Sequence, residues 1–145
     1  MKTVREVLQN KGSKIWSVSP DTTVFDALKL MAEKNIGSLI VMDGDQVAGI
    51  MSERDYARKV SILGKFTRET LVKEIMSSTI FYVDSSYHID ECMALMSNKR
   101  VRHLPVLEND KLVGIISIGD VVKAVIDEKE FVIEQLVHYI TGGHA

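Results

Sequence analysis

Two Ser-x-x-Asp pairs are the residues whose types and spacing could do chemistry in this chain. Ser52 precedes Asp55, and Ser117 precedes Asp120, each where a stretch with helical spacing begins. The unpaired N–H groups of a helix N-terminus attract phosphate. A serine hydroxyl there could reach a phosphate or ribose oxygen, and a carboxylate one turn later could accept hydrogen bonds from the vicinal hydroxyls of a ribose. Residues of these types at this spacing are therefore candidates for contacts to a phosphate and to a diol, as well as for helix caps.

The two pairs belong to an internal repeat. Residues 18–60 align with residues 83–125 without a gap, so that each Ser-Asp pair falls on the other. Residues 4–8 also resemble residues 72–76, less closely and at a sequence offset that differs from that of the main repeat. Because two like units tend to bury their apolar faces on each other, the repeat predicts one domain made of two halves. It also predicts a pseudo-twofold axis, along which clefts can hold ligands.

The spacing of apolar residues changes in the same order within each copy. In the first copy it predicts a short extended piece at 15–18, a helix at 24–32, strands at 39–42 and 47–51 around a turn, and a helix from Ser52 to Val60. The second copy predicts the same order, with elements at 81–83, 89–98, 104–107, 112–116 and from Ser117 onward. Each unit is thus an α/β unit of type β-α-β-β-α, with its helices on one face of a small sheet.

The flanking segments complete the predicted organisation. Residues 3–11 are expected to form a helix that stops at Gly12, and residues 61–70 to form a connector. The first unit is placed at residues 1–65 and the second, with a C-terminal helix, at 66–145. That last helix carries an apolar stripe, which is expected to pack on its own domain or on a second subunit; the stripe consists of Phe131, Val132, Leu136, Tyr139 and Ile140.

The segments that hold the Ser-Asp pairs resemble a known family. Gly49-Ile50-Met51-Ser52-Glu53-Arg54-Asp55 and Gly114-Ile115-Ile116-Ser117-Ile118-Gly119-Asp120 match the Gly-apolar-x-Ser/Thr-x-x-Asp signature of the cystathionine-β-synthase (CBS) domain. Val101-Arg102-His103-Leu104-Pro105-Val106 is similar to the second strand of that family. Two copies in tandem resemble a CBS pair, or Bateman module, of the stand-alone type found in bacteria and plant organelles.

The resemblance implies a regulatory module that binds an adenosine-containing ligand in clefts between the two units. AMP is the first expectation, with ADP, ATP, NAD and S-adenosylmethionine as alternatives, and no catalytic cofactor is implied. The resemblance also implies a disc-shaped homodimer. Besides the Ser-Asp pairs, the predicted ligand contacts are apolar residues that could face an adenine and polar or basic residues nearby; they are Ile50, Met51, Ile115, Ile116, Arg54, Arg102, His103, Ser38, Lys14 and Thr79.

The two predicted sites differ in charge. The second copy has Arg102 and His103 at the start of its second strand, where the first copy has Gly37 and Ser38. In the first copy Glu53 and Arg54 nearly cancel at the helix start, whereas the second copy has no acid before Asp120 there. The site at Ser117 and Asp120 is therefore expected to bind a phosphorylated adenosine more tightly.

A purely structural role stands beside the binding role. In a capping box, a serine side chain accepts a hydrogen bond from a backbone N–H, and an acid three residues later accepts one from the backbone N–H of that serine. Either pair taken alone favours capping. Two pairs at matching positions, each after a Gly-apolar strand, favour ligand binding. One serine can both cap its helix and contact a ligand.

Composition excludes several classes of protein. The chain has 145 residues, a net charge of −2 and no long basic cluster, which argues against binding to nucleic acid or to a membrane surface. The N-terminus lacks the apolar core of a signal peptide, and the single cysteine, Cys92, fits a reducing compartment. A cytoplasmic location is therefore expected. Cys92 replaces Ala27 on an apolar helix face and is expected to be an inert, buried thiol. The histidines at 88, 138 and 144 have no metal-ligand spacing, so no metal is expected.

An enzyme is the main alternative from another class. The sequence shows no nucleophile beside a base, no paired catalytic carboxylates, no Walker loop and no dinucleotide fingerprint. Catalysis is therefore not expected. A second alternative is a protein-interaction scaffold with degenerate nucleotide sites, and Glu53, which would repel a polyphosphate, favours it.

Overall fold

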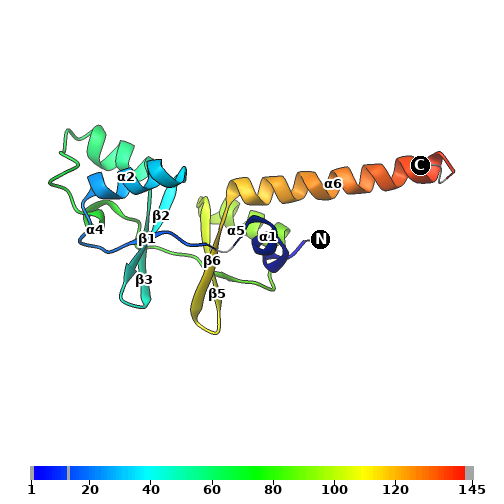
Figure 1. Cartoon of the computed structure of the whole chain (residues 1–145), viewed down its shortest axis with the longest axis horizontal. Coiled ribbons are helices and arrows are strands. Elements are labelled where there is room, and N and C mark those ends of the chain that lie inside the picture. Colours follow the sequence, from blue (N-terminus) through cyan, green and yellow to red (C-terminus); the bar gives the residue numbers. More distant parts are fainter. Residues whose placement is uncertain (1, 13, 143–145) are drawn as a thin grey trace. The chain divides into compact units, whose positions relative to one another are not determined.

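The computed structural model describes residues 2–12 and 14–142. The chain divides into two compact units, each with its own three-stranded sheet (Figure 1). The central unit is Ile15–Ile80, and the terminal unit combines Met1–Lys14 with Phe81–Ala145. The fold is mixed α/β, as the sequence predicts.

The central unit contains the first copy of the repeat. Its elements are β1 (Ser17–Val18), α2 (Val24–Lys34), β2 (Ser38–Asp43), β3 (Gln46–Ser52), α3 (Glu53–Tyr56), the π-helix η1 (Ala57–Ser61) and α4 (Val72–Ile75). The sheet order is β1-β2-β3, with β1 parallel and β3 antiparallel to β2. The predicted β-α-β-β-α order is confirmed, although the last predicted helix changes to a π-helix at Ala57.

The terminal unit contains the second copy and repeats this order. Its elements are α1 (Val4–Lys11), β4 (Val83–Asp84), α5 (Ile89–Lys99), β5 (His103–Glu108), β6 (Lys111–Ser117) and α6 (Ile118–Ile140). The sheet order is β4-β5-β6, again with one parallel and one antiparallel pairing. None of the helices in residues 2–12 and 14–142 is long and apolar enough to cross a membrane.

Local sequence signals explain where these elements begin and end. Thr23 caps α2 by accepting a hydrogen bond from the Asp26 N–H at 3.2 Å, and the helix ends at Asn35 in the left-handed region. Gly12, with φ of +89°, ends α1 where the sequence predicts a stop. The hairpin β5–β6 turns through Asn109 and Asp110, both at positive φ, which is the geometry of tight hairpin turns.

The compact units do not follow the boundary expected at residues 65 and 66. Helix α1 packs on β6 of the second copy, and α4 packs on β3 of the first copy. The N-terminal segment is held by hydrogen bonds such as Val4 N–H to the Tyr87 carbonyl at 2.8 Å. Each short helix that precedes a copy therefore packs on the other copy. The physical reason is burial: Val4, Val7 and Leu8 lie in the core of the terminal unit.

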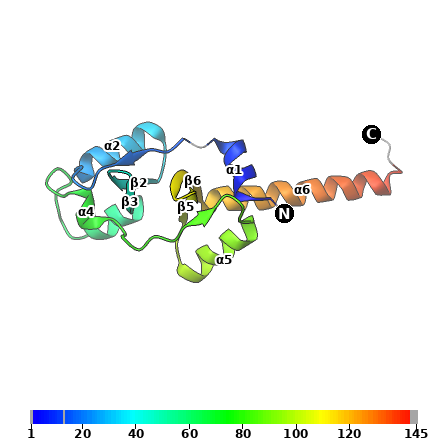
Figure 2. The same cartoon turned by 90° about the horizontal axis from the view of Figure 1, so that it is seen from below.

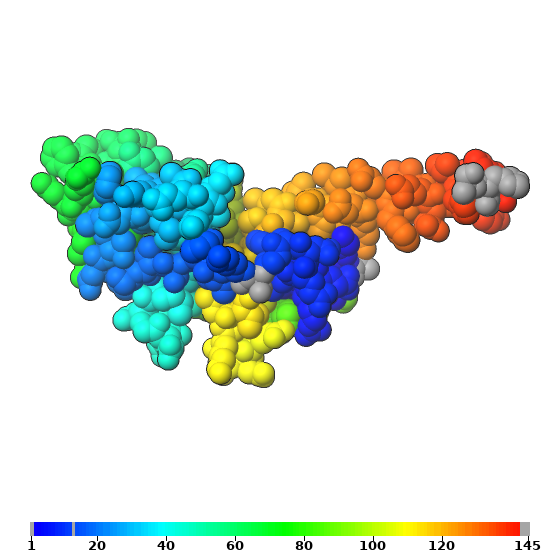
Figure 3. Space-filling view, viewed as in Figure 1, coloured from blue at the N-terminus to red at the C-terminus, as the bar shows by residue number. Residues whose placement is uncertain are grey.

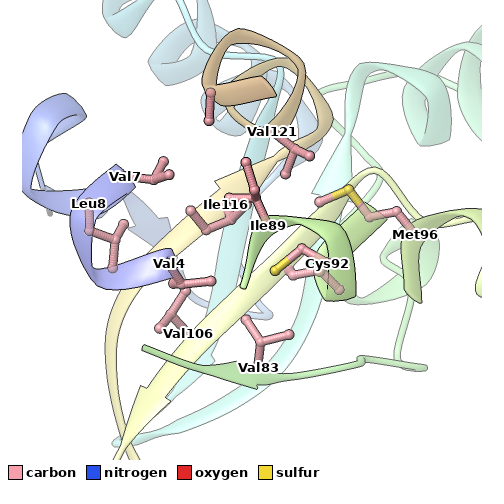
Figure 4. Packing of buried hydrophobic residues seen from close by; sticks show 12 residues of the cluster. Val4, Val7, Leu8, Val83, Ile89, Cys92, Met96, Val106, Ile116 and Val121 are labelled. Carbon is pink, nitrogen blue, oxygen red and sulfur yellow. The ribbon is translucent and has the colours of Figure 1, made fainter. Parts of the chain in front are cut away.

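Each unit has its own apolar core. In the terminal unit α1, β5, β6 and α5 surround one cluster of side chains, in which Val4 and Ile116 are fully buried (Figure 4). Cys92 belongs to this cluster, and its burial raises the pKa of the thiol to about 11, which agrees with the expectation of an inert thiol. In the central unit the corresponding cluster includes Leu39, Val41 and Met51.

The C-terminal stripe does not pack on its own unit. Val121 and Ala124 are the buried residues of α6, and every residue from 129 to 140 is exposed. The helix continues past α5 of the same unit (Figure 2). Helical geometry also removes Phe131 from the stripe, because five residues separate it from Leu136 and place the two on different faces. The expected packing on the same domain is therefore wrong, and a second subunit remains as the predicted partner.

Candidate functional site

Ser117 and Asp120 form a complete capping box at the start of α6. The Asp120 N–H donates to Ser117 Oγ at 3.1 Å, and the Ser117 N–H donates to Asp120 Oδ2 at 2.8 Å. Ser117 has an extended backbone as the last residue of β6, and this turn from strand to helix aims its side chain at the helix end. The capping role is therefore present, and the chemistry left to the pair depends on the remaining oxygen atoms.

Lys11 brings a positive charge to Asp120 from the other end of the unit's sequence. Its Nζ lies 2.6 Å from Asp120 Oδ2 and donates to the Ile115 carbonyl at 2.9 Å. Burial raises the pKa of the Asp120 carboxyl, but the hydrogen bonds from Lys11 and Ser117 and the charge of Lys11 outweigh it, so the net pKa lies below its ordinary value. The site therefore holds an ionised carboxylate whose side chain is only 22% exposed.

Ser52 and Asp55 repeat the capping box at the start of α3. Asp55 Oδ2 accepts from the Ser52 N–H at 2.9 Å and from the Ser52 hydroxyl at 3.0 Å. Lys59 lies 3.2 Å from the other carboxylate oxygen, Oδ1, and also donates to the Ile75 carbonyl at 2.9 Å. Each aspartate is thus paired with a lysine that also holds a backbone carbonyl.

The two carboxylates differ in how their oxygens are used. In Asp55 the capping bonds go to Oδ2 and the lysine lies at Oδ1. In Asp120 the backbone and lysine bonds both go to Oδ2, and Oδ1 takes neither. A carboxylate oxygen can accept two hydrogen bonds, so Asp120 retains more capacity to accept from a ribose.

In the second site the start of β5 lies beside the start of α6, as the sequence predicts. His103 is the register partner of Ser117, and the Ile118 N–H donates to the Arg102 carbonyl at 2.9 Å. Arg102 is exposed and His103 is half-buried. The structure therefore brings Arg102, His103, Ser117 and Asp120 together on one end of the sheet.

The first site has the same backbone arrangement with different side chains. Ser38 is the register partner of Ser52, and the Glu53 N–H donates to the Gly37 carbonyl at 3.1 Å. Arg54 is exposed in the first turn of α3, next to Glu53. The charge difference between the two sites that the sequence predicts is thus present at matching positions.

Two of the predicted adenine contacts are wrong. Met51 and Ile116 are fully buried in the cores of their own units, and a bound ligand could not reach them. The reason is the alternation of side chains along a strand, which sends neighbouring residues to opposite faces. Ile50 and Ile115 point to the other face and are half-buried, so they remain as the predicted apolar contacts.

Lys14 and Thr79 remain predicted ligand contacts. Both residues are exposed, Lys14 at the end of the first segment of the terminal unit and Thr79 near the end of the central unit. The Thr79 carbonyl accepts a hydrogen bond from the Ser77 hydroxyl at 3.4 Å.

Sequence reasoning missed Lys11 and Lys59. Lys59 is four residues from Asp55, a spacing that favours ion pairs on a helix, so a local signal was available. Lys11 is far from Asp120 in the sequence, and no local pattern joins them. The weak similarity between residues 4–8 and 72–76 indicates that α1 belongs to the repeat. It does not indicate the copy on which α1 packs.

A pocket of about 250 Å³ lies beside the Lys11–Asp120 pair, within the terminal unit. Its polar lining contains more positive than negative groups and consists of Lys2, Asn10, Lys11, Lys123, Asp120 and Asp127. Among residues 2–12 and 14–142, no group of three or more His, Cys, Asp or Glu side chains is placed to hold a metal ion. His144 lies outside the described residues.

Comparison with known proteins agrees with this geometry. The family model of the CBS domain matches the chain twice, at residues 4–62 and 72–127. The "CBS domain-containing protein CBSX3, mitochondrial" of Arabidopsis thaliana is 38% identical over 98% of this chain and 73% of its own length.

Solved structures share the fold. A putative signal-transduction protein with CBS domains from Burkholderia ambifaria MC40-6 is 52% identical, with a TM-score of 0.84 over 87% of this chain and 95% of that chain. The CBS domain pair of protein MJ0100, solved in complex with 5′-methylthioadenosine and S-adenosyl-L-methionine, has a TM-score of 0.77 over 88% of this chain and 98% of that chain. At 19% identity this last likeness is one of fold.

Proposed function

The chain belongs to the CBS-domain family, and on that premise we propose that it is a regulatory module that binds an adenosine-containing ligand and performs no catalysis of its own. AMP is the first candidate, with ADP, ATP and NAD as alternatives. The ligand binds at the helix starts that follow β3 and β6, and the site at Ser117 and Asp120 is the tighter one.

The state of Asp120 is the observation that carries this proposal. An ionised carboxylate that is mostly buried is costly unless it is paired and hydrogen-bonded, and Lys11 and Ser117 supply the pairing. Both of those bonds go to Oδ2, which leaves Oδ1 to accept from a ribose hydroxyl. A charge-assisted hydrogen bond of this kind is roughly twice as strong as a neutral one.

The charges around Asp120 favour a phosphorylated ligand. Arg102 is exposed beside the start of α6, and the N-terminus of that 23-residue helix carries a partial positive charge. Ile118 and Gly119 stand where the first site has Glu53 and Arg54, so no side-chain acid precedes Asp120 in this helix. The MJ0100 pair, which shares the fold, was solved with two adenosine compounds, and this adds support by analogy.

A scaffold without a nucleotide is the second candidate. It is favoured by the complete capping boxes, which give both serines and both aspartates a structural role without any ligand. Exposed apolar residues in the connector of the central unit also suit a protein partner; Ile62, Leu63 and Phe66 are 75%, 62% and 71% exposed. In this reading Asp55 and Asp120 only cap their helices.

Nucleotide extraction separates the two candidates. Protein purified without added nucleotide is denatured, and the released small molecules are identified by mass spectrometry. We expect an adenosine compound in the wild type and less of it in Asp120→Ala. Wild-type protein that releases none, and that binds none of AMP, ADP, ATP and NAD when each is added, would favour the scaffold.

Two further expectations stay predictions. The cytoplasmic location rests on composition alone, and one relative carries the word mitochondrial in its name. The homodimer rests on the family resemblance and on the exposed apolar face of α6.

A further inference from the structure

Helix α6 extends well beyond the part of the chain that matches the CBS family. The family match ends at residue 127, whereas α6 continues to Ile140. Its last turns expose large apolar side chains: Val132, Ile133, Leu136, Val137 and Ile140 are each at least half exposed. In the face shown in Figure 3 the red end of α6 stands clear of the other segments of its unit. Contiguous apolar surface of this kind marks an interaction site.

The apolar residues of α6 follow the spacing of a coiled coil. Six positions recur at alternating intervals of four and three residues, and we call them the α6 seam: Val122, Ile126, Lys129, Ile133, Leu136 and Ile140. A strict repeat of 3.5 residues keeps one line of side chains facing a partner helix. Val125, Val132 and Tyr139 lie beside the seam and widen it. The opposite face carries acids such as Asp127 and Glu134.

Lys129 is the one charged residue of the seam. It is exposed, and it sits between Ile126 and Ile133 where an apolar side chain would complete the pattern. A single polar residue in such a seam specifies register and orientation, at a cost in stability. The partner helix should therefore present negative charge at the position that faces Lys129.

We propose that the C-terminal part of the α6 seam, from Lys129 to Ile140, pairs antiparallel with the same part of the α6 seam of a second copy of this chain. When Ile133 faces Leu136 of the second copy, Lys129 faces Ile140 in the last turn of that helix. A helix C-terminus carries partial negative charge, which favours a lysine there. A parallel pair would instead set Lys129 against Lys129, two like charges in an apolar contact. Charge thus selects a second copy in antiparallel orientation.

The pairing is self-complementary, which a twofold dimer requires. In the antiparallel register each Lys129 meets a helix end and each Ile133 meets a Leu136, so both copies make the same contacts. The inference does not depend on nucleotide binding. It deepens the proposed homodimer by naming its surface.

Sedimentation velocity over a range of protein concentrations tests the seam. Ile133→Asp places a charge in the seam, and Phe131→Asp is its matched control, because Phe131 is two residues away, 61% exposed against 59%, and on another face. We expect Ile133→Asp to raise the dimer dissociation constant by about thirtyfold or more and Phe131→Asp to change it little. A dimer that tolerates Ile133→Asp would show that copies associate elsewhere and would overturn the inference. A wild type that stays monomeric would overturn the homodimer as well.

Disulfide cross-linking tests the orientation. Ile133→Cys and Leu136→Cys proteins, of different mass through a tag, are mixed and oxidised. The native Cys92 is fully buried and contributes little background. An antiparallel pair gives mainly the mixed 133–136 disulfide. Predominant 133–133 and 136–136 disulfides would show a parallel pair and would overturn the proposed orientation.

Discussion

Lys11 and Asp120 form an ion pair of 2.6 Å between the first helix of the chain and its last. The pair fixes α1 on the start of α6 and holds the carboxylate of Asp120 ionised. It therefore joins the stability of the terminal unit to the state of the proposed ligand site.

This pair makes stability depend on pH. The pKa of Asp120 is lower in the folded chain than its ordinary value of 3.8, because the bonds from Lys11 and Ser117 outweigh the effect of burial. The stabilisation is therefore present above the unfolded pKa and is lost as the pH falls through the folded pKa. We expect wild type to exceed Asp120→Asn in free energy of unfolding above about pH 5, and the difference to shrink below about pH 4. Denaturant unfolding between pH 2 and pH 7 measures it, and a difference that does not change with pH would contradict the account.

Gly114 allows α1 to approach β6. A Cβ atom at residue 114 would lie 2.7 Å from a methyl carbon of Leu8, so Gly114→Ala should destabilise the chain by about 1–3 kcal/mol. Because the obstacle is a side chain, Leu8→Ala in the same protein should recover part of that loss, with a coupling of about 0.5–3 kcal/mol. Gly37→Ala is the control, since the nearest atom to its Cβ would be 3.9 Å away. Purely additive losses in Gly114→Ala and Leu8→Ala would show that α1 does not press on this glycine.

Ligand should stabilise the folded chain. If AMP binds the native state only, AMP at about 100 times its dissociation constant adds about 2.7 kcal/mol to the free energy of unfolding. The thermal midpoint should then rise by several degrees with AMP and not with the same concentration of a pyrimidine nucleotide. Equal midpoints with and without every adenine compound, NAD and S-adenosylmethionine included, would support the scaffold reading.

Arg102 should recognise the phosphate rather than the nucleoside. It is exposed next to the start of α6, so Arg102→Ala should weaken AMP binding by about tenfold and adenosine binding much less. Lys111→Ala removes the same charge from an exposed position at the hairpin end of β6 and serves as the control. Equal losses for AMP and adenosine in Arg102→Ala would place the phosphate elsewhere, with Arg54 as the next candidate.

The sequence predicts the elements well because their signals are local. The change from helical to strand spacing and the turn residues at 43–45 and 108–110 lie within a few positions of the elements that they define. The capping boxes are equally local, since Ser117 and Asp120 are three residues apart. Strand alternation could also have excluded Met51 and Ile116 as ligand contacts, because each neighbours a residue that points to the other face.

The contacts that sequence reasoning missed join distant segments. Lys11 reaches Asp120 only because α1 packs on β6, and the spacing of residues in α1 does not specify that partner. The compact units also differ from the boundary expected at residues 65 and 66, which follows the order of the repeats and agrees with the family matches at 4–62 and 72–127, because Val4 and Leu8 are buried in the terminal unit. Packing between segments far apart in the chain decides both.

Calorimetric titration with AMP measures whether Asp120 contributes to ligand binding. Asp120→Ala should weaken binding by about ten- to a hundredfold, because it removes charge-assisted hydrogen bonds to the ribose. Glu91→Ala is the matched control: it removes the carboxylate that caps α5 of the same unit, where the His88 N–H donates to Glu91 at 3.2 Å. We expect AMP binding in wild type and Glu91→Ala and a large loss in Asp120→Ala. Wild-type affinity for AMP in both Asp120→Ala and Asp55→Ala would contradict it and leave capping as the role of these aspartates.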